Sequence, residues 1–473
     1  MTTGNSPAEA TDRAAGLDPA TAEDPIFSPL EFRNLTVKNR VFRSNISGRF
    51  DNYDGSGSPV RINWELKFAR GGVGTIISSF VPVVIEGRIV PNYATIDHDD
   101  RIRFWRELGE RVHEHGCKFI MQLSHGGRQR DIVGFERPTS FGPTAQIERI
   151  HGLRANAMDS AHIKQTVRDF ADGARRARAA GLDGVELHSA NGYLFTQFLS
   201  SAINDREDEY GGSLENRARF ILEVVRAIRT EVGDDFHLQA KISAVDHNNA
   251  VLPWEPRGNT INDSVQVCRW LEEAGVDAIH VSTGSMFPHP RNPAGFFPVD
   301  VAAQTYGAMI STARFGLRNY IVFRTPGLRR LFQWIWGRTT PDADHIEGLT
   351  LPDARRIKKA VSIPVICTGG FQTASVIRRA ITEGDCDGVS MARTLVANND
   401  LVNLFAGGHD QAPRPCTYCN RCLIHTLQNP LGCYEEKRFD SREEMVEQVL
   451  SVYRPSWPPE AEAERGEAAP ATV

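Results

Sequence analysis

The chain has 473 residues, of which 41% are hydrophobic and 24% are charged, and its formal net charge at pH 7 is −5. These are ordinary values for a globular chain with a substantial core, and the net acidity excludes a global basic field that would recruit nucleic acid. The first residues are polar and acidic, unlike a secretory signal, and the apolar runs are shorter than the ~20 residues of a spanning helix. We therefore expect a cytoplasmic protein that does not bind nucleic acid.

Both ends of the chain lack apolar periodicity. Residues 1–24 and 455–473 are rich in Ala, Pro, Glu and Thr, a composition that cannot bury enough apolar surface to fold. We predict disordered tails there, a barrel over residues 25–405 and an extension over residues 406–454.

Eight short runs rich in β-branched and other apolar residues recur along the barrel region. In chain order they are RVFRS, GTIISSF, CKFIMQLS, GVELHS, FHLQAKIS, DAIHVSTG, IPVICTGG and DGVSMA. Several are apolar at successive positions, as strands buried on both faces must be.

The segments between these runs have helical spacing. From Ser160, apolar residues recur at steps of three and four, and the stretches 214–231, 263–275, 352–361 and 373–383 behave similarly. Eight strands separated by helices predict an α/β fold, a closed (β/α)₈ TIM barrel, with its chemistry at the carboxyl ends of the strands.

One connection is too long for a loop and a single helix. About eighty residues separate DAIHVSTG from IPVICTGG, and residues 311–339 contain six arginines, several aromatic side chains and no acidic residue. A basic, aromatic-rich amphipathic segment can lie on an anionic membrane surface. The interpretation that we favour is a helical lid or subunit contact whose aromatic residues are core. We place this insertion at about residues 305–350, after the sixth strand.

Polar side chains follow the predicted strands at the point where each ends. They include two cations, Lys241 and Arg393, which suit a large, planar, anionic ligand that forms hydrogen bonds. Gly369 and Gly370 follow the seventh strand and Arg393 the eighth, where these barrels commonly bind phosphate. The sequence therefore predicts a phosphate-bearing cofactor at this end of the barrel.

Several longer motifs resemble the Old Yellow Enzyme family of FMN-dependent ene-reductases. They are the opening IFSPLEFRNLTVKNRVF, which resembles that family's N-terminal hairpin, HGGR after the third strand, HSANGYLFTQFLSSAINDREDEYGGSLENRARF after the fourth, and the TGG and SMAR pair. The resemblance covers residue 26 to about residue 405. It implies a TIM barrel that binds FMN and uses NADH or NADPH as reductant.

The resemblance also implies roles for individual residues. Ser44, Asn45 and Ile46 would contact FMN through their backbone, and Ser47 would tune the O4 edge of the flavin. Gln122 would bind the pyrimidine edge and Lys241 would lie near N1 and O2, where most members have Arg. The phosphate would be held by Gly369, Gly370, Ala392 and Arg393.

Three further residues match the family's catalytic positions. His188 and Asn191 match the donor pair that grips the substrate's carbonyl or nitro oxygen, which polarises a conjugated C=C bond. Tyr193 matches the proton donor to the α-carbon.

Four cysteines are clustered in the extension, at Cys416, Cys419, Cys422 and Cys433. Four thiolates suit either [4Fe–4S] or Zn²⁺, and a site without metal is the remaining alternative. The spacing resembles the Fe–S segment of the large branch that includes 2,4-dienoyl-CoA reductase and trimethylamine dehydrogenase, in which His289 would match a substrate-side His. That branch continues into further flavin- and nicotinamide-binding domains, which we do not find after Cys433.

The favoured function is FMN-dependent reduction of an activated C=C bond in an enone or enoyl-type substrate. The first alternative is a dehydrogenase that passes electrons from substrate through FMN and a [4Fe–4S] cluster to a partner protein. The second is a non-catalytic electron-transfer subunit. We expect a homo-oligomer with a small-molecule substrate.

Overall fold

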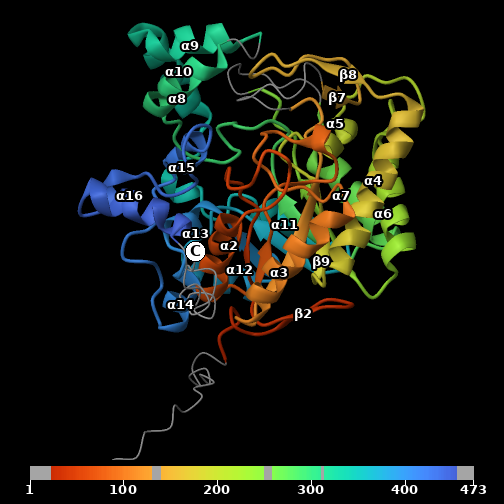
Figure 1. Cartoon of the computed structure of the whole chain (residues 1–473), viewed down its shortest axis with the longest axis horizontal. Helices are drawn as coiled ribbons and strands as arrows, with labels where there is room; N and C mark the ends of the chain where they lie inside the picture. Colours follow the sequence, from red (N-terminus) through yellow and green to blue (C-terminus); the bar gives the residue numbers. More distant parts are fainter. Residues whose placement is uncertain (1–22, 130–139, 250–257, 311–313, 455–473) are drawn as a thin grey trace, which may run out of the picture.

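The computed structural model describes residues 23–129, 140–249, 258–310 and 314–454 (Figure 1). Apart from Glu23 and Asp24, the two predicted tails lie outside these residues.

The centre of the molecule is a closed barrel of eight parallel strands. In spatial order they are β3 (Val41–Arg43), β4 (Thr75–Ile77), β6 (Lys118–Ser124), β9 (Gly184–Ser189), β10 (His237–Ser243), β11 (Ala278–Ser282), β12 (Val365–Thr368) and β13 (Gly388–Met391), and β13 pairs with β3 to close the ring. A short strand, β5 (Val81–Pro82), pairs with the end of β6. The predicted (β/α)₈ fold is therefore confirmed, and each of the eight strands lies within a predicted run.

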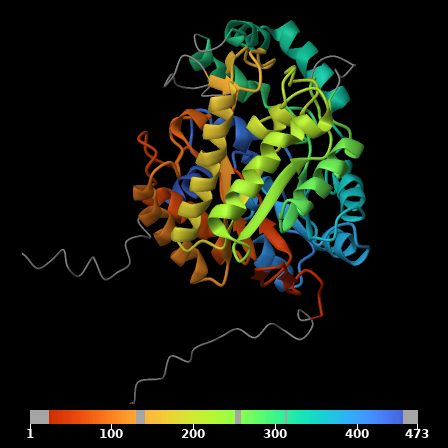
Figure 2. The same ribbon diagram turned by 90° about the vertical axis from the view of Figure 1, so that its right-hand side faces the viewer.

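Helices surround the barrel (Figures 1 and 2). They are α2 (Pro59–Arg70), α3 (Ile102–His113), α4 (Ser160–Ala179), α5 (Leu194–Leu199), α6 (Leu214–Val232), α7 (Ile261–Glu273), α11 (Leu351–Lys358), α12 (Ala374–Thr382), α13 (Arg393–Ala397) and α14 (Leu401–Ala406). Helix α4 shows why the sequence folds this way. The Asp159 carboxylate caps it by accepting from the backbone N–H of His162 at 2.8 Å, and Ile163 and Phe170 are fully buried on its apolar face.

The amino end of the barrel is closed by a hairpin. Strands β1 (Leu30–Glu31) and β2 (Thr36–Val37) are antiparallel, and Leu30 and Val37 pack against Phe42 and Ile120 from inside the barrel. This apolar plug leaves the carboxyl end of the strands as the open end, where the predicted site lies.

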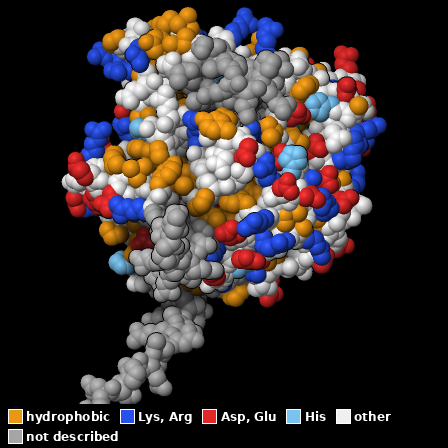
Figure 3. Space-filling model, viewed as in Figure 1, with side chains coloured by type: hydrophobic (Ala, Val, Ile, Leu, Met, Phe, Trp, Pro, Cys, Tyr) orange, Lys and Arg blue, Asp and Glu red, His pale blue; other side chains and the backbone are white. Residues whose placement is uncertain are grey.

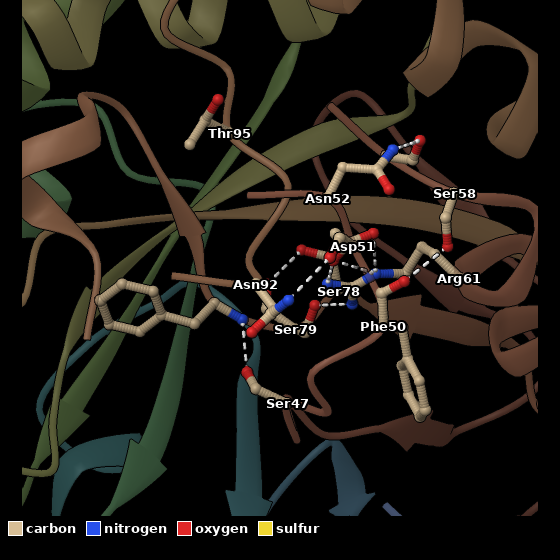
Figure 4. A network of polar contacts seen from close by, with 12 residues as sticks. Ser47, Phe50, Asp51, Asn52, Ser58, Arg61, Ser78, Ser79, Asn92 and Thr95 are labelled. Atoms are coloured by element: carbon tan, nitrogen blue, oxygen red, sulfur yellow. Dashed lines mark hydrogen bonds and ion pairs between the residues drawn. The ribbon is translucent and has the colours of Figure 1, made fainter. Parts of the chain in front are cut away.

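A network of buried charges fixes the chain that follows β3, and Figure 4 shows its Asp51–Arg61 pair. Arg61 contacts the carboxylates of Asp51 at 2.6 Å and Glu65 at 3.5 Å, and Glu65 also pairs with Arg43. Two arginines and two carboxylates balance, so removing one partner would leave a buried unpaired charge, at a cost of about 3–5 kcal/mol.

The long connection after β11 is helical and lies at the opposite end of the molecule from the hairpin (Figures 1 and 2). It contains α8 (Val299–Thr305), α9 (Gly316–Arg324) and α10 (Pro326–Thr339). The extension contains α15 (Arg421–His425) and α16 (Arg442–Leu450). None of the helices in the described ranges is both long enough and apolar enough to cross a membrane.

Candidate active site

A cavity of about 280 Å³ opens at the carboxyl ends of the barrel strands. Most of the predicted site residues line it, namely Ser44, Asn45, Ile46, Ser47, His188, Asn191, Tyr193, Lys241, Gly369, Gly370, Ala392 and Arg393. They come from five different strands or the loops that follow them. The closed barrel thus brings together residues that are far apart in the sequence.

Lys241 is a buried cation in the wall of this cavity. Its Nζ donates to Ser44 Oγ at 3.2 Å and to Asn45 Oδ1, and no carboxylate of the described residues forms an ion pair with it. Burial lowers the pKa of Lys241 to about 8, although the nearby Glu186 carboxylate opposes this effect. A bound anionic group would offset the energetic cost of burying this charge.

Asn45 links Lys241 to His188. Because Asn45 Oδ1 accepts from Lys241, its Nδ2 faces His188 Nε2 at 3.4 Å. This assignment makes Nε2 the acceptor and leaves the proton on Nδ1, an atom that is buried without a partner among the described residues. The sequence indicated only a backbone role for Asn45, so this side-chain role was missed.

His188 and Asn191 leave polar atoms unsatisfied at the cavity. His188 Nδ1 and Asn191 Oδ1 are both buried without a hydrogen-bond partner among the described residues. Burial and Lys241 hold the pKa of His188 well below 6.5, so its ring is neutral at pH 7. Asn191 has a left-handed backbone (φ 60°), and a Cβ at Gly192 would lie 2.2 Å from the Ser285 carbonyl oxygen. Gly192 therefore permits the tight turn from β9 to Tyr193.

Tyr193 lies in an aromatic cluster on the same wall. Its ring centroid is 4.9 Å from that of Phe80 and 4.8 Å from that of His188, both edge to face. Burial and the neighbouring Tyr93 raise the pKa of Tyr193, so it is a protonated phenol at pH 7. Phe80 and Tyr93 were not predicted, because hydrophobic residues after a buried strand look the same whether they face a core or a cavity.

The predicted phosphate end contains Gly370 and Arg393. Arg393 Nη1 donates to the Ala294 carbonyl at 2.7 Å, and its guanidinium lies 5.4 Å from the Tyr418 ring centroid. No carboxylate of the described ranges forms an ion pair with Arg393. Gly370 has φ 71°, a backbone conformation that favours glycine, and its carbonyl accepts from the Tyr418 hydroxyl at 2.6 Å.

Gln122 lies beneath the cavity wall instead of on it. Its amide donates to Glu186 at 2.7 Å, while its Oε1 is buried without a partner in the described part of the chain. Glu186 also contacts His280 at 2.7 Å. The unpartnered Oε1 is an acceptor for a donor such as the N–H of a pyrimidine edge.

The contacts bear on two further predictions. His289 is buried but does not line the cavity, and its Nδ1 accepts from the Arg291 backbone while its Nε2 contacts the Asn249 carbonyl at 3.1 Å. Arg291 lines the cavity in its place. The backbone N–H of Ser44 donates to the Met391 carbonyl at 2.8 Å, so a backbone contact of Ser44 with a cofactor would use its carbonyl oxygen.

The four clustered cysteines line a second, smaller cavity. Cys416, Cys419, Cys422 and Cys433 share it with Arg438, whose Nη1 donates to Cys433 Sγ at 3.0 Å. Within the described ranges, no three metal-ligating side chains lie as close together as a single bound ion requires. The prediction that the four cysteines face one site is consistent with this cavity, whereas a metal centre is not shown.

Comparison with known proteins identifies the family. A model of the NADH:flavin oxidoreductase / NADH oxidase family, a family of FMN oxidoreductases, matches residues 25–307. The chain belongs to this family. The predicted resemblance to Old Yellow Enzyme is thereby confirmed, and the family match ends where the helical insertion begins.

Individual relatives agree with this assignment. The chain is 30% identical over 428 residues to an NADH oxidase of Thermoanaerobacter brockii, covering 87% of this chain and 57% of the relative. It is 29% identical over 451 residues to a cinnamate reductase of Clostridium sporogenes, covering 90% of this chain and 61% of the relative. The chain thus spans about 60% of these relatives' length.

Two solved structures share the fold. One is a 2-naphthoyl-CoA reductase complex, with a TM-score of 0.72 and 22% identity over 91% of this chain and 58% of the other. The other is an old yellow enzyme homologue from Zymomonas mobilis, with a TM-score of 0.61 and 21% identity over 86% of this chain and 99% of the other.

Proposed function

We propose that this protein is an FMN-dependent reductase of activated C=C bonds that uses NADH or NADPH. The observation that carries the proposal is the common cavity of Lys241, Arg393, His188, Asn191 and Tyr193. It joins two cations without carboxylate partners to a donor pair and a phenol. Relatives named cinnamate reductase and alkene reductase/demethylase support the reaction class.

The polar groups in the wall of the cavity fit FMN. Lys241 is a desolvated cation, and Arg393 and Gly370 lie together at the other side of the cavity. Gln122, whose Oε1 is buried without a partner in the described residues, lies beneath the wall. Lys241 would hold the pyrimidine edge and Arg393 the phosphate, with Ser47 at the O4 edge. Gln122 would reach the pyrimidine edge only if its side chain turned into the cavity from beneath the wall. When bound, FMN would supply the hydride that adds to the β-carbon.

The remaining residues act on the substrate. Neutral His188 and Asn191 would bind the carbonyl oxygen, withdrawing electron density from the conjugated bond so that the β-carbon accepts hydride. Tyr193 would give its hydroxyl proton to the α-carbon and regain one from solvent, so one hydride and one proton are added across the double bond.

The test is reconstitution of the purified protein with FMN and anaerobic turnover of a simple enone with NADH or NADPH. Asn191→Leu should retain FMN and its reduction but lose enone turnover. A protein that binds no FMN, or an Asn191→Leu variant that turns over at the wild-type rate, would contradict the proposal.

The cysteine cavity favours a second candidate, in which substrate is oxidised and electrons leave through a [4Fe–4S] cluster. Arg393 and Asn420 line both cavities, so the two sites are adjacent. All four cysteines line one cavity, and four thiolates are the ligand set of a [4Fe–4S] cluster. One relative of the chain is named N,N-dimethylglycine/sarcosine dehydrogenase, which supports an oxidation as the second candidate.

Metal analysis tests whether the cysteines hold a cluster. Anaerobically purified protein should contain about four irons per chain, and Cys419→Ala should lose them. One zinc per chain would replace the cluster. A non-catalytic electron-transfer subunit would need neither Tyr193 nor the donor pair, so enone turnover excludes it.

A further inference from the structure

Helices α9 and α10 present an unusual number of apolar side chains to solvent. Of the ten large hydrophobic side chains that are exposed in the described residues, five lie on these two helices, among them Leu331 at 52% and Trp334 at 58% exposure. The others are Leu317, Ile321 and Leu328, and the spacing of three or four residues gathers them on one side of each helix. Figure 3 shows hydrophobic side chains at the top of the molecule, over these helices.

The same surface is strongly basic. Six arginines, all exposed, lie on or beside the two helices at positions 314, 318, 324, 329, 330 and 338. Between residues 314 and 339 there is no acidic residue, and no carboxylate of the described residues forms an ion pair with any of the six. Arg338 instead lies 4.8 Å from the centroid of the exposed Trp334 ring. Lys and Arg side chains flank the apolar surface in Figure 3.

The opposite side of α10 reaches the active-site cavity through one residue. Trp336 from α10 is buried, packs against Phe297 with ring centroids 4.8 Å apart, and donates through Nε1 to the Gly295 carbonyl at 3.1 Å. Trp336, Phe297 and Tyr306 all line the cavity. Helix α10 thus lies between the exposed apolar surface and an aromatic wall of the cavity.

We propose that the α9–α10 surface docks on an anionic lipid bilayer and that the enzyme reduces a lipophilic enone taken from that bilayer. An apolar face bordered by arginines lies in the headgroup region of a membrane, with its side chains buried and its cations against lipid phosphates. The substrate-class part rests on the proposed function, whereas the docking part does not.

Charge selects this occupant over a second copy of the chain. In a symmetric dimer the same surface meets itself, so six arginines of each protomer would face six identical arginines with no acidic residue between them. An anionic bilayer provides the complementary charge, at about a fivefold gain in affinity for each arginine near the surface.

The test is co-sedimentation of the full-length, FMN-loaded protein with vesicles of phosphatidylcholine, with and without phosphatidylglycerol. Binding should require phosphatidylglycerol and weaken at high salt. Arg329→Gln/Arg330→Gln should bind about 25-fold more weakly, and Leu331→Glu should not bind. The matched control is Arg103→Gln/Arg226→Gln, which removes two exposed arginines from the barrel helices α3 and α6.

Turnover then separates the two proposals. The variants with weakened vesicle binding, Arg329→Gln/Arg330→Gln and Leu331→Glu, should reduce a long-chain enone delivered in vesicles more slowly than the wild type. They should keep the wild-type rate on a short, water-soluble enone. Normal turnover of the short enone without vesicle binding would overturn the docking and leave the function standing. Vesicle binding without turnover of either enone would support docking and refute the function. The docking would also be overturned if the control variant lost vesicle binding as much as Arg329→Gln/Arg330→Gln does. It would be overturned equally if the wild type bound no vesicles but formed a dimer that Leu331→Glu dissociates.

Discussion

Replacing the buried cation Lys241 by Met should change protein stability and cofactor affinity in opposite directions. Burial lowers the pKa of Lys241 from 10.5 to about 8. Below pH 8 the residue is charged in both folded and unfolded chains, so the full burial cost, about 3 kcal/mol, opposes folding. Lys241→Met removes that charge and should raise the free energy of unfolding of the FMN-free protein by about this amount at pH 7.

The pH dependence of this gain follows from the same pKa values. Between pH 8 and 10.5 the unfolded chain binds a proton that the folded chain has lost, so wild-type stability rises with pH in this window. The advantage of Lys241→Met should therefore shrink from pH 8 and disappear near pH 10.5. FMN affinity should move the other way, because the variant lacks a charge-assisted contact, and should fall about 10- to 100-fold at pH 7.

The assay is urea unfolding of the FMN-free protein at several pH values, together with FMN titration followed by flavin fluorescence. Lys67 is a matched control, because burial also lowers its pKa to about 8, yet it does not line the cavity. Lys67→Met should raise stability without changing FMN affinity. A Lys241→Met protein that is less stable than wild type at pH 7, or that binds FMN equally well, would refute the reasoning.

Further predictions concern the substrate side and the cysteine cavity. Asn191→Leu should lower enone turnover about 10²- to 10³-fold while FMN stays bound, as measured by steady-state rates and flavin absorbance. Tyr193→Phe should slow the oxidative half-reaction with enones far more than reduction by NADH or NADPH, which stopped-flow absorbance separates; equal slowing of both would exclude Tyr193 as proton donor. Because the pKa of His188 lies well below 6.5, the turnover rate should show no titration of His188 between pH 6 and 8. A sigmoidal step in that range would contradict a neutral His188 ring if the step persisted in Tyr193→Phe and disappeared in His188→Asn. Cys419→Ala should lower iron from about four per chain to none without releasing FMN, as measured by metal analysis.

The barrel could be predicted because its strands are buried on both faces and therefore appear as continuous apolar runs. The site followed from the same logic, since polar residues at the carboxyl ends of parallel strands converge in a closed barrel. His289 shows where this reasoning stops. It lies in a tight irregular turn, where His289 pairs with Asn292 and Arg291 with Ala294, and side-chain direction there depends on dihedral angles that sequence periodicity does not encode. The contact between Asn45 and His188 escaped prediction for a similar reason, because it depends on the orientation of a single amide.

The helical insertion and the extension supply what the barrel alone lacks. The match ends at residue 307, yet Trp336 from α10 and Asn420 from the extension both line the cavity. The barrel strands carry the donor pair, Lys241 and the phosphate-end residues, which suit the common cofactor chemistry. The insertion contributes an aromatic wall and the extension separates this cavity from the cysteines. Substrate choice and electron exit should therefore change independently: replacing α9–α10 side chains should alter which enone is reduced, whereas replacing the cysteines should alter only iron content and electron transfer to a partner.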